Sequence, residues 1–373
     1  MTKTETTPPK VRWAVVGQGY FSQVAILPAF AHVENSVLTA LFSDDDTKLA
    51  VLKDKYDVDH VLRYEQYDEF LRSGAVDAVY LALPNDMHCE FTERAAMAGV
   101  HVLCEKPMAV STEECRRMIT ACETAQVKLM IGYRLHFDEA HLRVIDLVSR
   151  WAIGDPRAMT SLFSMPVREG NIRTQREHGG GPLFDIGIYC INAARCVFQS
   201  EPVEVVAFKA TRPSDKRFNE VEEQVGAVLR FPGDRIATFA STFGGADVND
   251  LRVVGTDGWI RLDPAFEFAT PLRMETMIGG KHRKKRFRRH DQVAPEIEHF
   301  ADCVLNDRQP EPSGQEGLAD VAIIEAIYQS ASSGRPVSVD LPSRRPGPIM
   351  GQARKMPASD APTLVDAAQP SDS

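Results

Sequence analysis

The chain has 373 residues, 43% hydrophobic and 25% charged, a composition typical of a globular protein with room for two domains. Its net charge of −9 and pI near 5.6 argue against general nucleic-acid binding, which needs a basic face. The first ten residues, MTKTETTPPK, are polar and contain no apolar signal core. No apolar run could span a bilayer, so we expect a cytoplasmic protein without a membrane partner.

The cysteine count is odd and no Cys-x-x-Cys spacing occurs. Neither a disulfide framework nor a zinc ribbon is therefore indicated. We expect the cysteines to behave as small buried hydrophobic residues in a protein of a reducing compartment. The cysteines are Cys89, Cys104, Cys115, Cys122, Cys190, Cys196 and Cys303.

The first third of the chain alternates short β-branched runs with helical patterns. The expected strands are Val11–Val16, Val37–Phe42, Ala78–Ala82, His101–Leu103 and Lys128–Ile131. The expected helices lie near Phe21–Ala31, Asp46–Tyr56, Tyr67–Ser73, His88–Ala98 and Thr112–Ala125. Ser111 followed by Glu114 forms a capping box for the last helix. This alternation predicts an α/β fold, a doubly wound parallel sheet of the Rossmann type over residues 11–133.

Strand patterns dominate the second half. They are Ala158–Ser164, Val203–Thr211, Gln224–Phe231, Ile236–Thr242, Leu251–Gly255 and Trp259–Leu262. The turns "FPGD" and "GTDG" join them as hairpins, and helical patterns return at Ala294–Leu305 and Gln315–Ser332. We predict an α+β domain over residues 134–342 with a large, open, mostly antiparallel sheet. Residues 343–373, rich in Pro, Ser, Ala and Asp, are expected to be a disordered tail.

A basic run, KHRKKRFRRH, spans Lys281–His290. We interpret it as a solvated strand or hairpin arm. A docking site for an acidic or phosphorylated partner is the alternative, which the overall acidity of the chain weakens.

The turn after the first strand is suited to phosphate. Gly17 and Gly19 permit a tight turn and a close approach of pyrophosphate to the backbone. The helix that follows directs its N-terminal N–H groups and dipole at the phosphate, with Tyr20 and Phe21 expected beside the cofactor. Ser22 replaces the usual third glycine, where a small residue is sufficient for packing. The turn predicts a dinucleotide site.

The tip of the second strand bears on the choice between NAD and NADP. NAD sites usually place a carboxylate there, whereas Ser43 offers a hydroxyl and Lys48 a positive charge. Asp44, Asp45 and Asp46 would repel a phosphate if they faced it, but Asp46 is expected instead to cap the next helix. We favour NADP, with NAD as the alternative.

Two further segments end at the carboxyl edge of the sheet, where ligands bind in such folds. In "LALPNDMH" we expect Leu83, Pro84, Asn85 and His88 near the cofactor. In "HVLCEKPMAV", Glu105 and Lys106 follow the next strand. Proline holds the residue before it extended, so Lys106 should point into the cleft.

The stretch "HGGGPLFDIGIY" predicts a helix that carries two candidate catalytic side chains. Asp185 and Tyr189 are four residues apart and share a face, with Gly187 between them leaving room for a close approach. A carboxylate and a phenol on one face suit proton transfer at a hydroxyl, and a nearby ammonium would favour the phenolate. A plain helix start with a half-buried tyrosine is the alternative.

His136 and His141 in "HFDEAH" do not match a zinc-binding helix spacing. We interpret both as solvated helix residues and assign no metal.

Together these motifs resemble the glucose–fructose oxidoreductase / inositol dehydrogenase (Gfo/Idh/MocA) family, from about residue 11 to residue 340. The matching segments are "VGQGYF…ILPAF", "DAVYLALPNDMHCEF", "HVLCEKPMA", "KLMIGYR", "GGGPLFDIGIY" and "EGLADVAIIEAIYQSASSGRPV". Tyr189, where many relatives have histidine, and the Ser43–Lys48 pair resemble the glucose–fructose oxidoreductase branch.

The resemblance implies NADP-dependent hydride transfer between a nicotinamide and a sugar or polyol. It implies Lys106 beside the nicotinamide and substrate, Asp185 and Tyr189 in the substrate site, and Arg134 near the cofactor. It also suggests a homodimer or homotetramer. Three alternatives stay open: dehydrogenation of another diol such as a trans-dihydrodiol, NAD-dependent glycoside cleavage, and a non-catalytic cofactor-sensing module.

Overall fold

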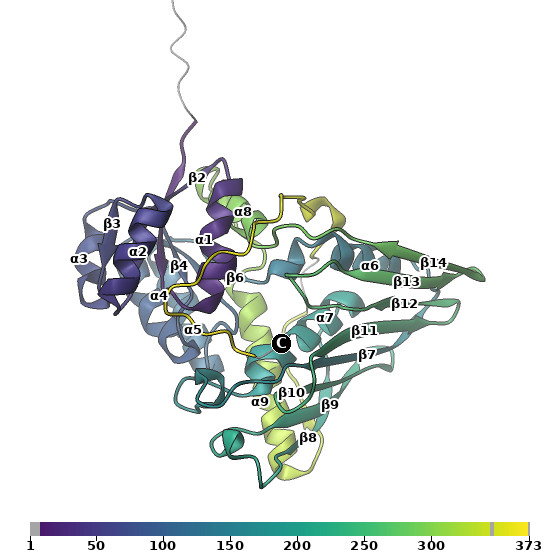
Figure 1. Cartoon of the computed structure of the whole chain (residues 1–373). Helices are drawn as coiled ribbons and strands as arrows, with labels where there is room; N and C mark the ends of the chain where they lie inside the picture. Colours follow the sequence, from purple (N-terminus) through teal and green to yellow (C-terminus); the bar gives the residue numbers. More distant parts are fainter. Residues whose placement is uncertain (1–7, 344–346, 372–373) are drawn as a thin grey trace, which may run out of the picture.

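The computed structural model describes residues 8–343 and 347–371. They form a Rossmann domain beside a second domain that is built on a larger sheet (Figure 1). Both predicted fold classes are confirmed.

The Rossmann domain contains a six-stranded parallel sheet in the order β3-β2-β1-β4-β5-β6. Its strands are β1 (Val11–Val16), β2 (Ser36–Phe42), β3 (His60–Leu62), β4 (Ala78–Leu81), β5 (His101–Glu105) and β6 (Leu129–Gly132). The order reverses between β1 and β4, and in open α/β sheets the crevice at such a point binds ligands. The sequence missed β3, whose three residues are too few to show a period.

The helices of this domain match the predicted positions to within a few residues. They are a π-turn over Ser22–Ile26 that continues into α1 (Leu27–Ala29), then α2 (Asp46–Tyr56), α3 (Tyr67–Arg72), α4 (His88–Met97) and α5 (Thr112–Thr124). Asp45, not Asp46, caps α2 by accepting the Lys48 N–H at 2.9 Å. The prediction for Asp46 was wrong because its carboxylate pairs instead with Arg63 at 2.6 Å.

The second domain contains a nine-stranded sheet in the order β14-β13-β12-β11-β7-β10-β9-β8-β15, antiparallel except between β7 and β10. Its strands are β7 (Pro156–Ser164), β8 (Glu204–Ala210), β9 (Gln224–Phe231), β10 (Arg235–Thr242), β11 (Val248–Gly255), β12 (Gly258–Leu262), β13 (Arg273–Ile278), β14 (Lys281–Arg286) and β15 (Val337–Ser338). All six residues of β14 are exposed at the sheet edge, which confirms the solvated hairpin arm.

In the described residues, four α-helices complete the second domain, and two of them return to the Rossmann domain. They are α6 (Glu139–Ser149), α7 (Ile188–Phe198), α8 (Ala294–Leu305) and α9 (Gly314–Ser333). Phe300 of α8 packs against Trp13 of β1 with ring centroids 5.5 Å apart. Gly317 lets α9 approach the Rossmann domain, since a Cβ there would lie 2.8 Å from the Met108 Cβ. These contacts hold the two domains together.

A buried ion network fixes α7 against α9. Arg195 of α7 is 1% exposed and contacts three carboxylates: Glu201 at 2.5 Å, Asp320 at 2.5 Å and Glu316 at 3.1 Å. Burial, more than any other influence, raises the pKa of Asp320 to about 6. Charges this deeply buried are retained when paired, so the network sets the position of α7 and of the residues just before it.

The C-terminal segment differs from its prediction as a disordered tail. Residues 347–371 run in an extended path over the molecule and hydrogen-bond to it at several points. The Asp291 N–H, for example, donates to the Met356 carbonyl at 3.2 Å. Figure 1 shows the segment crossing in front of α1 towards the second domain.

The seven cysteines are free and buried, as predicted. Within the described residues, no helix combines the length and the apolar character that crossing a bilayer requires.

The cap of α5 gives a test of this local structure. Ser111 Oγ accepts the Glu114 N–H at 3.2 Å, while the Glu114 carboxylate accepts the Val110 N–H. We expect Ser111→Ala to lower the free energy of unfolding by about 1 kcal/mol, because the N–H loses its acceptor. Glu113→Ala in the same turn is the control and should change it by less than about 0.5 kcal/mol. Urea denaturation measures both, and equal effects would contradict the cap.

Candidate active site

The glycine turn after β1 forms a cradle open on one side. Gly17 has φ +94°, and a Cβ there would lie 2.4 Å from the Ala82 carbonyl oxygen. A Cβ on Gly19 would meet nothing within 4 Å, so that side has space for a phosphate. Ser22 Oγ donates to the Gly17 carbonyl at 2.6 Å, so the serine braces the turn. This geometry fits the pyrophosphate of a dinucleotide.

The tip of β2 contains the predicted Ser43 and Lys48. Ser43 is buried, and its hydroxyl accepts the Asp45 N–H at 3.2 Å. The Lys48 ammonium lies 3.9 Å from the Asp45 carboxylate. Asp45 and Asp46 are therefore engaged by the helix cap and by Arg63, and the lysine remains close to the strand tip.

His88 does not face the candidate cofactor site, although the sequence predicted it to lie near the cofactor. It is fully buried, with its ring nitrogens 2.9 Å from the Pro107 carbonyl and 3.0 Å from the Leu83 carbonyl. Burial lowers its pKa. His88 therefore ties the end of β4 to the loop after β5. Asn85 donates from Nδ2 to the Gly179 carbonyl at 2.9 Å, so the β4 edge also contacts the second domain.

Glu105 supports the lysine that follows it. Tyr80 donates its hydroxyl to Glu105 Oε1 at 2.8 Å, and Oε2 accepts the Lys106 backbone N–H at 3.2 Å. Burial raises the pKa of Glu105, against the lowering influence of Lys106. The carboxyl group thus holds the end of β5 in place beneath the Lys106 side chain.

Lys106 reaches from the Rossmann domain to the second domain. Its ammonium donates to the Asp185 backbone carbonyl at 2.7 Å and lies 3.4 Å from Oδ1 of the same residue. Arg173 Nε donates to Asp185 Oδ2 at 2.8 Å. Burial alone would raise the pKa of Asp185, but Arg173 and then Lys106 outweigh it and hold the pKa below its ordinary value. Asp185 is therefore an ionised bridge between two cations.

Tyr189 lies beside the same ammonium. The Lys106 Nζ is 4.7 Å from its ring centroid, and the Arg134 guanidinium carbon is 5.0 Å away. Asp185 belongs to the π-turn Leu183–Gly187 that leads into α7, where Tyr189 follows. π-turns occur often at functional sites. The predicted trio of Lys106, Asp185 and Tyr189 is thus together in space.

Gly187 allows close packing within the chain, whereas the sequence suggested that it leaves room for another group to approach. A Cβ at this position would meet Leu183 Cδ1 at 2.9 Å and Ser241 Oγ at 3.0 Å. The glycine therefore lets the helix pack closely on β10. The group that approaches Gly187 is thus a strand of the same chain.

Arg134 is buried beside the phenol. Its guanidinium donates to the Gln292 side chain and, at 2.5 Å, to the Phe266 carbonyl. The rings of Phe266 and Tyr189 lie 5.9 Å apart. Arg134 therefore positions one wall of the site, and its charge faces the Tyr189 ring.

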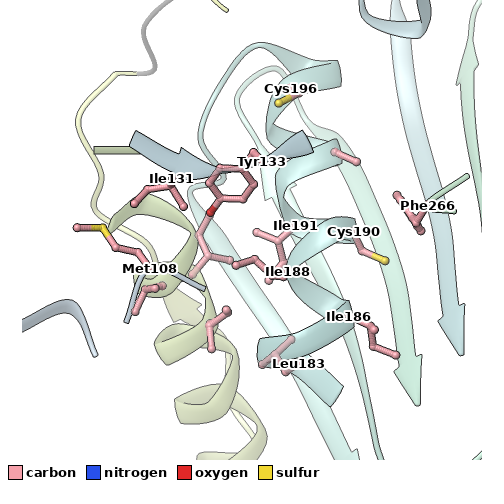
Figure 2. Close-up of a cluster of buried hydrophobic side chains, with 14 of the residues drawn as sticks. Met108, Ile131, Tyr133, Leu183, Ile186, Ile188, Cys190, Ile191, Cys196 and Phe266 are labelled. Carbon is pink, nitrogen blue, oxygen red and sulfur yellow. The ribbon is translucent and has the colours of Figure 1, made fainter. Parts of the chain in front are cut away.

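The inner side of α7 packs on the Rossmann domain. Figure 2 shows Ile188 and Ile191 of α7 facing Tyr133, with Ile131 and Met108 beyond it. A small cavity of about 30 Å³ lies along this helix, and both Lys106 and Tyr189 line it. This volume accommodates one or two water molecules.

His136 and His141, predicted to be solvated, are instead 1% and 7% exposed. His141 Nδ1 lies 3.1 Å from the buried carboxylate of Asp138. The ligating atoms of His136, Cys196 and Glu316 lie within 4.8 Å of one another. Because Glu316 is bound by Arg195, we assign this group to the ion network and no metal to it.

Sequence reasoning missed several residues at the site. Arg173 lies in the one-turn 3₁₀ helix Ile172–Thr174 of one loop, and Phe266, Glu267 and Phe268 lie in a second, irregular loop, where no periodicity marks them. The rings of Phe268 and Phe21 meet at 5.9 Å, so this second loop reaches the glycine turn. Only long-range contacts show these roles.

The ionised Asp185 gives a pH-dependent prediction. A carboxyl group with a depressed folded pKa contributes stability above its unfolded pKa of about 3.9, and this is lost as the pH falls through the folded value. At pH 7 we expect Asp185→Asn to lower the free energy of unfolding by about 1–3 kcal/mol. The deficit should shrink below about pH 4. Urea unfolding across this range measures it, with the exposed Asp234→Asn as control; a deficit independent of pH would contradict the ion bridge.

Comparison with known proteins agrees with this fold. Residues 11–133 match the model described as the oxidoreductase family with an NAD-binding Rossmann fold. Residues 141–261 match the GFO/IDH/MocA C-terminal domain.

Individual relatives cover most of the chain. D-xylose 1-dehydrogenase [NADP(+)] of Haloarcula marismortui is 32% identical over 91% of this chain and 95% of its own. The crystal structure of aldose-aldose oxidoreductase from Caulobacter crescentus, complexed with glycerol, is 38% identical with a TM-score of 0.85, over 88% of this chain and 99% of its own. Trans-1,2-dihydrobenzene-1,2-diol dehydrogenase of Xenopus laevis is 26% identical over 86% and 96%. The chain therefore belongs to the GFO/IDH/MocA family of oxidoreductases, and its first domain is an NAD(P)-binding Rossmann fold.

Proposed function

We propose that this protein is an NADP-dependent oxidoreductase that moves a hydride between the nicotinamide and a sugar or polyol. The observation that carries the proposal is the meeting of Lys106 with Asp185 and Tyr189 at the carboxyl edge of the Rossmann sheet. Similarity to a xylose dehydrogenase and an aldose-aldose oxidoreductase supports a sugar as substrate.

Each residue of the trio has a role in this proposal. When bound, the nicotinamide supplies the hydride acceptor or donor. Tyr189 takes the proton from the sugar hydroxyl as the C–H bond breaks, or returns it in the reverse direction. Lys106 holds the hydroxyl oxygen, and Asp185 orients Lys106. A cyclic aldose oxidised at C1 gives a lactone, and the reverse direction reduces a sugar carbonyl.

Removal of the phenol tests the proton transfer. We expect Tyr189→Phe to lower kcat by about 10²–10⁴-fold, because the hydroxyl proton loses its acceptor. The Kd for NADPH should stay within about twofold, since the ring still packs on Phe266. Steady-state kinetics and fluorescence titration measure the two quantities. Full turnover with cofactor bound would contradict the role of Tyr189.

NADP preference follows from the tip of β2. Ser43 provides an uncharged hydroxyl and Lys48 a positive charge, while the Asp45 and Asp46 carboxylates are engaged elsewhere. A 2′-phosphate placed at this tip would meet the Lys48 ammonium.

Removal of that ammonium tests the preference. We expect Lys48→Met to raise the KM for NADP about tenfold, as loss of one charged contact implies, and to leave the KM for NAD within about twofold. Lys53→Met on the same helix is the matched control and should change neither. Equal effects on both cofactors would refute NADP selection by Lys48.

A diol without a sugar ring is the second candidate substrate, favoured by the similarity to trans-1,2-dihydrobenzene-1,2-diol dehydrogenase. A panel of aldoses, polyols and trans-dihydrodiols, assayed with NADP and NAD, separates the two. Higher kcat/KM on a trans-dihydrodiol than on every sugar would replace the sugar assignment.

The open face of the nine-stranded sheet supports assembly as a homodimer or homotetramer. Phe208, Val228, Ile236 and Val254 expose 73%, 41%, 43% and 40% of their surface there, and apolar patches of this kind mark interfaces. Sedimentation analysis measures the assembly state.

The free cysteines agree with a reducing, cytoplasmic location.

A further inference from the structure

The last described residues, 363–371, lie against the dinucleotide groove, and we call them the C-terminal strap. Three walls of the groove contact it. These are the glycine turn through Gln23, helix α2 through Lys55, and the second domain through Val167 and Arg168.

The contact at the glycine turn is a two-point clamp. The Gln23 amide donates to the Val365 carbonyl at 2.8 Å and accepts the Val365 N–H at 2.8 Å. The same Gln23 Nε2 lies 3.0 Å from the Gln18 carbonyl, within the Gly17–Gly19 turn. Gln23 is fully buried, so one amide joins the phosphate cradle to the strap.

The strap is held on both sides of this clamp. Lys55 of α2 donates to the Thr363 carbonyl at 3.0 Å. Farther along, the Arg168 N–H donates to the Pro370 carbonyl at 3.0 Å, and Ser371 pairs with Val167 as an antiparallel bridge. The strap therefore starts on the Rossmann domain and ends on the second domain, near the loop that contains Arg173.

We propose that the C-terminal strap forms an outer wall of the dinucleotide groove and must lift before the bound cofactor leaves. The strap and the cofactor site are coupled through Gln23, because its amide contacts both the Gln18 carbonyl of the glycine turn and the Val365 backbone. Coupling of this kind is reciprocal: if closure slows cofactor release, the bound cofactor stabilises closure. The proposal rests on the dinucleotide site alone and is independent of which sugar the enzyme uses.

Release of the reduced cofactor tests the proposal. NADPH is bound to the full chain and to three variants and is chased with excess NADP⁺ while its fluorescence is followed. One variant ends at Pro362, and Val365→Pro removes the N–H that Gln23 accepts. We expect the truncated chain to release NADPH about tenfold faster, because it loses both Gln23 hydrogen bonds, and Val365→Pro about three- to fivefold faster, because it loses one. Ala368→Pro, at an exposed position of the strap, is the control and should stay within about twofold. A parallel series with NADH separates the strap from the NADP preference.

Hydrogen exchange measures the coupling in the opposite direction, which is the effect of bound cofactor on closure of the strap. Amides of residues 363–371 in the full chain should exchange more slowly with NADPH bound than without it. Unchanged release in the truncated and Val365→Pro chains would overturn the proposal and leave the strap as a structural tie. Tighter binding after truncation would also overturn it, since the strap would then compete with the cofactor.

Discussion

The bridge from Lys106 to Asp185 is the interaction on which the rest of the site depends. It joins a strand end of one domain to a helix start of the other, with the ammonium 2.7 Å from the Asp185 carbonyl. Any shift between the domains would break it. The structure prevents such a shift by packing α8 on β1 and by using Gly317 to bring α9 against Met108.

Charge is distributed unevenly between the inner and outer sides of α7. Behind the helix, Arg195 neutralises part of a buried group of three carboxylates and fixes α7 to α9. In front of it, Lys106, Arg134 and Arg173 surround Asp185 and Tyr189. The buried network supplies rigidity, and the front side carries the residues of the candidate site.

Much of this was predictable because it depends on local patterns. Alternation of strands and helices gave the Rossmann sheet, and β1, β9, α2 and α8 begin and end where the patterns indicate. Lys106 was predictable because it follows a strand at the ligand edge, and Asp185 with Tyr189 because of their helical spacing. Their convergence needed the second domain to fold back, which no local pattern encodes.

Several of the misses share one cause, which is that the partner lies far away in sequence. His141 was expected in solvent, but its ring stacks on Phe266, 125 positions further along the chain, with ring centroids 6.1 Å apart. Arg173 lies in a one-turn 3₁₀ helix and Phe266 in an irregular loop, and the contacts of both come from other segments. The composition of residues 347–371 suggested disorder, whereas their backbone finds partners such as Gln23, 342 positions from Val365.

The most direct test of the central claim follows the hydride itself. Enzyme loaded with NADP⁺ is mixed in a single turnover with D-xylose or D-glucose deuterated at C1, and the reduced cofactor is analysed by mass. The account predicts deuterium on the nicotinamide, one per site, and a slower transfer than with the unlabelled sugar. Reduced cofactor without deuterium, or cleavage of a nitrophenyl glycoside with no net reduction, would contradict it.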